Sequence, residues 1–384
     1  MPTRSATVDI TGSLVEWAIN EAGLTIPEAA EKARLSAESI RAWISDNASP
    51  TRVELRRLAD AVHRPVALFY LPEPPTVANV PPALRRLAGA DQRQLTPDQL
   101  RQVRRARRVQ RLLASLLAEE GVEPTELPYF PPGHDPATVG AHVRQWLQIT
   151  VDQQVAWKSA KEAFDSWRDL LESEAILVLQ LQLGSVMRGF CLQDERAPLI
   201  AVNTAENYQA RSFTLFHELA HLFSRTASSC SDKPGRAVDG INIERWCEEV
   251  ASACVLPAEA VSDAVRKVGR RAENNFDLVR RVANELNLSL RATALALIRE
   301  KFLGREIYDE VDEKAPQSDR EKRGFGSGGR KAPEQRKAEF GHRSLSLIFH
   351  ALNSNRLTER DARDYLRLDG AEVDSLGAEV AASH

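Results

Sequence analysis

Residues 213–223 read FTLFHELAHLF, and this stretch decides the fold of the region around it. Most of the run is apolar, which predicts a buried helix that carries two histidines and a glutamate. Positions i and i+4 share one helix face, so His217 and His221 point the same way. Two imidazoles at this spacing can bind one zinc ion, and Glu218 between them can activate a zinc-bound water. The stretch therefore predicts a catalytic zinc site.

A second helix is expected to supply the remaining ligand. Residues 243–257 read IERWCEEVASACVLP, with apolar side chains at helical spacing. A catalytic zinc site needs a third protein ligand and one open position. Glu244 follows His221 by 23 positions, and a loop over roughly 224–240 lets the second helix return beside the first. We predict Glu244 as the third ligand. Glu248 lies one turn later on the same face, and we predict that it hydrogen-bonds a ligand histidine.

The motifs of both helices resemble the ImmA/IrrE family of bacterial zinc metallopeptidases. The matching residues are Arg211, Phe213-Thr214, His217, Glu218, His221, Glu244, Ala251 and Leu256-Pro257, and Ile200 to Asn203 resembles the preceding strand. The chain departs from the family at Cys247-Glu248, where Ala-Asn is usual, and at Val250, where Phe is usual. The resemblance spans roughly residues 130–300. It implies a protein substrate, often a helix-turn-helix repressor cleaved in response to stress or a mobile-element signal.

Several alternatives stay open at this point. An H-E-x-x-H pattern can arise by chance in a core helix, and Glu248 can equally face solvent. Cys247 and Cys254 lie seven residues apart, and buried free thiols are favoured over metal ligands for this pair. A developing oxyanion needs a donor besides the metal, and Tyr208 and Arg211 are the candidates near the motif.

Composition bounds the class of protein. The chain has 384 residues, of which 43% are hydrophobic, so two or three domains with a sizeable core are expected. The formal net charge of −3 gives no global attraction to nucleic acid. Four cysteines at irregular spacing suit a reducing cytoplasm. The N-terminus lacks an apolar signal core, and no run of 18 apolar residues predicts a membrane span. We therefore expect a cytoplasmic protein.

The first 71 residues are expected to form a bundle of short helices. Thr25 is a plausible cap for a helix that contains Pro27, and Ser36 caps a second helix over 37–44. A further helix over 52–62 packs behind them. This arrangement resembles the lambda-repressor-like (XRE) helix-turn-helix family. Arg34 stands where that family usually has a turn glycine, which strains the turn if the position needs a positive φ.

The role of this N-terminal domain stays open between DNA and protein. In the DNA reading, Ala37, Glu38, Ser39 and Arg41 face the major groove, and Arg52, Arg56 and Arg57 contact phosphates. Residues 1–70 contain eight Lys/Arg and nine Asp/Glu, and Glu38 would repel a phosphate backbone. Duplex binding depends on charge neutralisation, so this balance gives weight to the rival role of protein docking.

The rest of the chain predicts several further elements. Prolines over 72–82 predict an extended linker, and 97–120 predicts an amphipathic helix whose arginines either bind an acidic partner or face solvent. Strands are expected at 175–179, 189–192 and 199–202, after helical sequence over 137–172. Residues 276–300 resemble a second helix-turn-helix, more suited to packing or substrate docking than to groove reading. A Gly-rich charged segment over 312–341 is expected to be flexible, and 345–368 is helical again.

The predicted fold class is mainly α with a small sheet (α+β). The domains are an N-terminal helix-turn-helix bundle over 1–71, a linker and Arg-rich helix over 72–130, a minimal zincin-like peptidase over 131–305, and a helical C-terminal region over 306–384. The predicted function is that of a zinc-dependent endopeptidase acting on a protein. The alternative is a non-hydrolytic DNA-binding regulator with a metal-sensing domain.

Overall fold

The computed structural model describes most of the chain in two compact units, Met1–Arg107 and Arg108–His384. The described residues are 7–22, 24–62, 64–74, 95–185, 187–226, 230–231, 237–238, 241–286, 288–314 and 332–382. Most of the predicted proline linker, most of the predicted loop over 224–240 and residues 315–331 of the Gly-rich segment lie outside them. The two ends of that segment, 312–314 and 332–341, are helical, so the prediction of a flexible segment is wrong there. None of the helices in this described part combines the length and apolar character needed to span a membrane.

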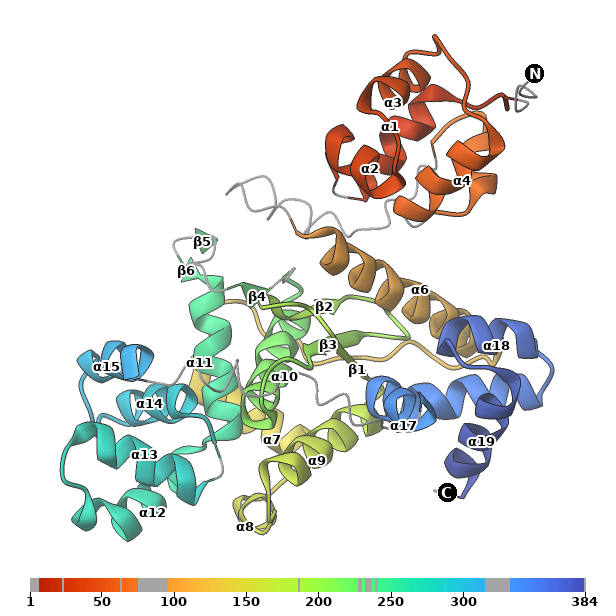
Figure 1. Cartoon of the computed structure of the whole chain (residues 1–384). Coiled ribbons are helices and arrows are strands. Elements are labelled where there is room, and N and C mark those ends of the chain that lie inside the picture. The colour runs from red at the N-terminus through yellow and green to blue at the C-terminus, as the bar shows by residue number, and fades with distance from the viewer. Residues whose placement is uncertain are drawn as a thin grey trace. The chain divides into compact units, whose positions relative to one another are not determined.

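The N-terminal unit contains four short α-helices around one apolar core (Figure 1). They are α1 (Gly12–Glu21), α2 (Ile26–Ala33), α3 (Ala37–Ile44) and α4 (Arg52–Ala61), followed by the 3₁₀ helix η1 (Val66–Tyr70). The predicted caps are confirmed, because Thr25 and Ser36 each accept a backbone N–H from the first turn of the following helix. Ile40 and Trp43 of α3 are buried in the core. Helices α2 and α3 form because polar side chains cap their first turns and their apolar faces pack into the shared core.

The turn between α2 and α3 carries the strain expected of it. Arg34 adopts φ 55° and ψ 47°, the left-handed region in which glycine is favoured. The N–H of Leu35 donates to the carbonyl of Ala30 at 2.9 Å and closes the end of α2. A non-glycine residue therefore occupies the left-handed position of this turn.

The larger unit is built on a small mixed sheet. Its strands are β1 (Leu177–Leu181), β2 (Met187–Leu192), β3 (Leu199–Asn203) and the two-residue β4 (Cys230–Ser231), in the order β1-β3-β2-β4. β1 and β3 are parallel, whereas β2 is antiparallel to β3 and to β4. The three predicted strands are confirmed, with boundaries shifted by up to two residues. β5 (Ala237–Val238) and β6 (Ile241–Asn242) form a separate pair.

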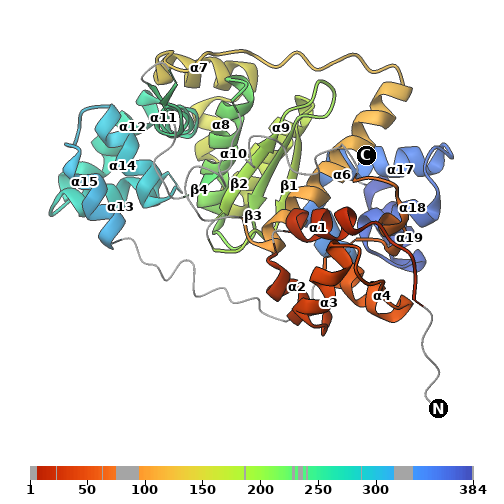
Figure 2. The ribbon, with the colours of Figure 1, turned by 90° about the horizontal axis from the view of Figure 1, so that it is seen from above.

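Helices cover the sheet and form the main core of this unit (Figure 2). They are α7 (Pro136–Trp146), α8 (Val151–Val155), α9 (Ala160–Ser173), α10 (Tyr208–Phe223) and α11 (Ile243–Val255). α10 packs against β2 and β3 of the sheet and against the helices α9 and α11. Because α10 is enclosed in this way, all of its last ten residues are buried.

A cluster of four helices follows α11 and completes this side of the unit. They are α12 (Ala258–Val268), α13 (Asn275–Glu285), α14 (Leu290–Arg299) and α15 (Glu306–Lys314), with the 3₁₀ turn η2 (Gly269–Arg271) before α13. α13 and α14 are the predicted second helix-turn-helix. α14 buries five of its ten residues and packs against α11, α13 and α15. A helix enclosed in this way suits packing better than groove reading.

Two further regions complete the described chain. The predicted arginine helix is α6 (Pro97–Glu119), which spans the division between the units. Its Arg108 lies over the ring of Tyr365 at 4.4 Å, so that arginine serves a contact within the protein. The C-terminal module, residues 332–382, contains α17 (Ala332–Asn353), α18 (Glu359–Leu366) and α19 (Gly370–Ala381). Helical structure over 345–368 is therefore confirmed.

Candidate metal centre

The two histidines lie on one buried face of α10. Asn207 caps the helix by accepting the N–H of Ala210 at 2.8 Å, which sets the register of the turns that follow. His217 is 2% exposed and His221 is fully buried. Their Nε2 atoms are 3.2 Å apart. The predicted i, i+4 juxtaposition is therefore realised inside the core.

α11 brings Glu244 to the same place. Asn242 accepts the N–H of Arg245 at 3.1 Å and starts the helix, so Glu244 falls in its first turn. Glu244 Oε2 lies 3.2 Å from His217 Nε2 and 3.6 Å from His221 Nε2. The carboxylate is about one-fifth exposed, more than either imidazole. Ligand atoms from two separate helices thus converge on one point.

The three side chains suit a divalent metal ion. Tetrahedral zinc has ligand bonds of about 2.0–2.2 Å, so its ligand atoms lie about 3.3–3.5 Å from one another. The observed separations of 3.2, 3.2 and 3.6 Å bracket that value. Within the described residues, these three form the group of His, Cys, Asp or Glu side chains that could hold a metal. Imidazole nitrogens with one carboxylate are a common donor set of catalytic zinc sites.

Electrostatics favour the ionised form of Glu244. Burial alone raises the pKa of this carboxyl, but hydrogen bonds and charge interactions with His217 and His221 outweigh it, and the pKa lies well below its ordinary value. A carboxylate that stays ionised can bind a cation without first losing a proton.

Thr226 fixes the orientation of one imidazole, and sequence analysis missed it. Its Oγ1 lies 2.9 Å from His221 Nδ1, and its N–H donates to the His221 carbonyl at 3.1 Å. Ser224 Oγ lies 2.7 Å from the same hydroxyl. When Nδ1–H donates to Thr226, the Nε2 lone pair of His221 is left for a metal. The only sequence signal is a hydroxyl residue just after the end of the helix, which is too common to be diagnostic.

Glu248 lies near the site, but the predicted hydrogen bond to a ligand histidine is not found among the described residues. Burial raises its pKa, while the charges of His217 and Arg188 lower it, so it lies near both. Among the described contacts, however, no hydrogen bond joins Glu248 to either histidine. The helical turn from Glu244 brings its carboxylate beside the site but does not bring it within hydrogen-bonding distance of a ring nitrogen. The hydroxyl of Thr226 makes that kind of contact instead.

Glu218 of α10 is fully buried between its own helix and the sheet. Gly189 of β2 faces it, and a Cβ at that position would lie 2.6 Å from Thr214 Cγ2, 2.8 Å from the Ala201 carbonyl and 3.3 Å from Glu218 Oε1. A side chain at 189 would therefore push α10 away from β2. A glycine inside a strand often marks such a close approach, and this signal was available in the sequence.

The two suggested oxyanion donors are used elsewhere. Arg211 is 8% exposed, and its guanidinium donates to Gln180 Oε1, the Glu206 carbonyl and the Thr204 carbonyl. Tyr208 lies under that guanidinium, with its ring centroid 4.6 Å away. Both residues brace the start of α10 and do not reach the ligand atoms. Their nearness in sequence was misleading, because they lie two helical turns away from the metal ligands.

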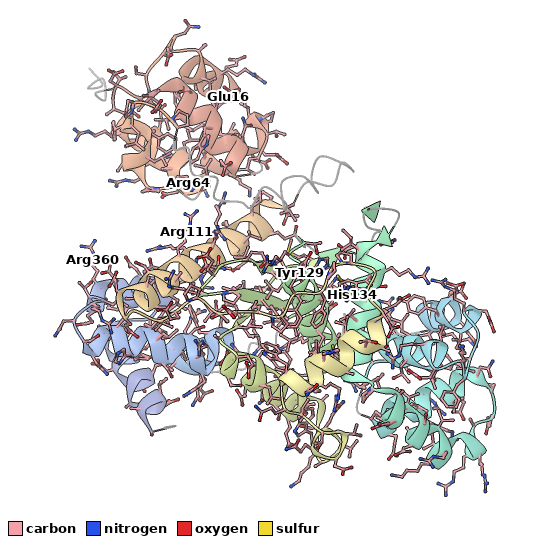
Figure 3. All side chains as sticks on the ribbon, turned by 180° about the vertical axis from the view of Figure 1, so that it is seen from behind. Glu16, Arg64, Arg111, Tyr129, His134 and Arg360 are labelled. Atoms are coloured by element: carbon pink, nitrogen blue, oxygen red, sulfur yellow. The ribbon has the colours of Figure 1, made fainter. Side chains whose placement is uncertain are left out.

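The segment between α6 and α7 contacts both α10 and α11, the helices that carry His217, His221 and Glu244. Tyr129 and His134, labelled in Figure 3, belong to it. The N–H of Phe130 donates to the carbonyl of Phe223 at the end of α10, at 3.1 Å. Trp246 Nε1 of α11 donates to the His134 carbonyl at 2.8 Å. One stretch of backbone therefore contacts both helices that supply the ligands.

The residues predicted to bind DNA lie together on the N-terminal unit. Glu38 and Arg41 of α3 and Arg52 of α4 are exposed, and Ala37 and Ser39 are partly buried. Ser39 is engaged locally, since its N–H donates to the Ser36 hydroxyl at 3.0 Å. The face that a helix-turn-helix would present is thus accessible, and its charge is mixed.

Comparison with protein families connects this site to a known class. Residues 171–297 match the family model of the IrrE N-terminal-like domain, Peptidase_M78. The matched range contains both histidines, Glu218 and Glu244. It supports the resemblance to the ImmA/IrrE family and a metallopeptidase-like function for this domain. No curated protein and no solved structure matches the chain. The N-terminal helix-turn-helix stays a prediction.

Proposed function

We propose that the chain is a zinc-dependent endopeptidase that cleaves a protein substrate. Zinc would be held by His217, His221 and Glu244, and Glu218 would serve as the catalytic base. The observation that carries the proposal is the convergence of three ligand atoms, 3.2–3.6 Å apart, beside a buried glutamate in a peptidase-family domain. Helix-turn-helix repressors acting in a stress or mobile-element response are the first substrates to test.

Each residue has a distinct task in this proposal. Bound zinc supplies Lewis-acid chemistry, activating water and polarising the scissile carbonyl. Glu218 accepts the proton of the attacking water and later delivers it to the leaving amine. Thr226 keeps the imidazole of His221 in the orientation that binds metal. Glu248 adds negative charge beside His217.

The Glu218→Gln variant tests the assignment of the base. The amide keeps the size of the side chain but cannot accept the proton, so cleavage should fall by at least about a hundredfold. Zinc content should stay at the wild-type level, because Glu218 is not a ligand. Glu249→Gln, a partly exposed position on α11 that pairs with Arg245, is the matched control. Purified protein is incubated with zinc and candidate repressors, and fragments are identified by mass. Wild-type cleavage rates in Glu218→Gln would refute the role.

DNA binding by the N-terminal unit is the second candidate function, with or without hydrolysis. The exposed Arg41, Arg52, Arg56 and Arg57 favour it. Duplex protection is measured with wild type and with Arg52→Ala, over a series of salt concentrations. Loss of a phosphate contact weakens binding to all sequences and lowers the salt slope by about one. If operator binding occurs and no substrate is ever cut, the non-hydrolytic regulator becomes the better account.

A further inference from the structure

Helix α17 of the C-terminal module is broken where it meets the rest of its unit. Gly341 has φ 74° and ψ 175°, a conformation that favours glycine. A Cβ at this position would clash with the Glu172 carboxylate and the Arg168 guanidinium. Both of these side chains belong to α9, and α17 lies beside α9 and β1 (Figure 1). The break therefore fits against one particular pair of charges.

Arg168 and Glu172 form a buried ion pair that caps both helix ends created by the break. Arg168 Nε lies 3.0 Å from Glu172 Oε1, and their side chains are 6% and 4% exposed. Arg168 donates to the carbonyls of Ala338 at 2.7 Å and Glu339 at 3.2 Å. Glu172 Oε2 accepts the N–H of Arg343 at 2.9 Å. A cation thus meets the C-terminal end of one helical half and an anion meets the N-terminal end of the other, which complements both helix dipoles.

Gln180 of β1 connects α17, at the place where it packs on α9, to helix α10, which carries His217 and His221. Its Nε2 donates to the Ala338 carbonyl at 2.8 Å, and its Oε1 accepts from Arg211 Nη1 at 2.7 Å. Gln180 is 7% exposed, and Arg211 lies in the first turn of α10, six positions before His217. A primary amide is the neutral side chain that can donate on one side and accept on the other. Glutamate could serve only Arg211, and methionine could serve neither.

We propose that Gln180 couples docking of the C-terminal module to the order of α10, and so regulates metal binding at the proposed active site. Docking of the module presents the Ala338 carbonyl, which holds the Gln180 amide in the orientation that Arg211 needs. Arg211 in turn ties the start of α10 to the end of β3. Undocking removes the carbonyl, and the first turns of α10 loosen. Gln180 is a positioning residue, because it acts on the ligands through Arg211.

The coupling can be measured in the full-length, metal-free protein, independently of any peptidase activity. Hydrogen exchange is followed in α10 and, as an internal reference, in α11. The variants are Gln180→Met, Gln180→Glu, Gly341→Val and the double variant Gln180→Met/Gly341→Val. The control is Gln110→Met, because Gln110 is a fully buried glutamine whose Nε2 donates to the carbonyls of Leu192 and Ala197. These bonds are separate from those that join Ala338, Gln180 and Arg211.

Gly341→Val and Gln180→Met should each raise exchange in α10 relative to α11 by about tenfold, the order expected when a buried hydrogen bond to a charged group is lost. The double variant should show no more than the larger single effect, because both changes cut one connection. Gln180→Glu keeps the Arg211 contact, so α10 should be less affected than in Gln180→Met. Gln110→Met should raise exchange in both helices together.

Additive effects in the double variant, or an unchanged α10-to-α11 ratio in Gln180→Met, would overturn the proposal. Zinc affinity, measured by competition with a chromophoric chelator, then tests the regulatory part. Zinc binding should weaken about tenfold in Gln180→Met and in Gly341→Val. If wild type binds no zinc, the proposed enzyme fails, while the exchange result still decides whether Gln180 couples the module to α10.

Discussion

Two buried polar clusters of the larger unit differ in how their polar groups are paired. In the ion pair of Arg168 and Glu172, donors meet acceptors, and the remaining capacity is used by backbone groups of α17. In the group of His217, His221 and Glu244, the ligand atoms of all three side chains face one another. The first cluster is satisfied by the protein itself. The second has the arrangement of a metal-ion donor set, in which a bound cation would offset the desolvation cost of bringing the three polar groups together.

The two clusters should respond differently when one of their side chains is removed. Removing a side chain from the ion pair should damage the fold, because its partners are groups of the protein. Removing a side chain from the convergent group should damage ligand binding first. The variants below test that distinction.

Glu244→Ala should have the largest effect on metal binding. It removes a ligand outright, so zinc affinity should fall by more than the roughly 10–100-fold expected for loss of an orienting partner. Zinc per chain is measured after dialysis against buffered metal, with wild type and Glu249→Ala alongside. Unchanged zinc content in Glu244→Ala would place the metal elsewhere and would remove the contrast between the two clusters.

Arg168→Met should have the largest effect on stability. It leaves Glu172 buried without its cation and leaves the carbonyls of Ala338 and Glu339 with fewer donors. Breaking a buried pair in this way costs about 3–5 kcal/mol of unfolding free energy. The double variant Arg168→Met/Glu172→Met should be less destabilised than the single variant, since no charge remains unpaired. Denaturant unfolding of the metal-free proteins measures both. A single variant as stable as wild type would contradict the view that this buried pair stabilises the break in α17.

The sequence could predict one of these clusters and not the other, for a physical reason. His217 and His221 are one helical turn apart, so local geometry alone brings them together. Glu244 could be predicted from the sequence because its helix follows that of the histidines after a single loop. Arg168 and Gln180 instead meet a carbonyl some 170 and 158 positions away, at a helix break that no local pattern marks. Contacts of a side chain with a distant backbone carbonyl leave no residue-type signature on the partner.

The difference between local and distant contacts also explains which other features could be predicted from the sequence. The strands and the ligand helices follow from apolar runs and caps, and these predictions are confirmed. Thr226 and Gly189 were missed, because a hydroxyl after a helix and a glycine in a strand are common. Periodicity correctly placed Glu248 near His217, but it does not fix the distance and angle that a hydrogen bond requires. The substrate and the role of the N-terminal unit stay predictions.

Thr226→Val should have an intermediate effect on the metal site. Valine preserves the shape of the side chain but cannot accept the hydrogen bond of His221 Nδ1–H, so the imidazole loses the contact that selects its tautomer. Zinc affinity should fall by about 10–100-fold. Ser224→Ala, which removes the neighbouring hydroxyl and leaves the Thr226 contact, should change affinity much less. Equal losses in both variants would indicate that the turn as a whole, and not this hydroxyl, orients the ring.

The smallest effect is expected from pH acting on Glu172. Burial raises the pKa of this carboxyl above its ordinary value of 4.5, and the nearby Arg168 and the N–H of Arg343 offset this only in part. Because the folded state binds the proton more tightly than the unfolded state, the contribution of Glu172 to stability is greatest at low pH. It declines as pH rises from 4.5 through the raised pKa. Glu172→Gln does not titrate, so the stability difference between wild type and this variant should shrink between pH 4.5 and neutrality. Denaturant unfolding at a series of pH values measures the difference. A difference that grows with pH would show that Arg168 dominates over burial, and the pair would then behave as a simple ion pair.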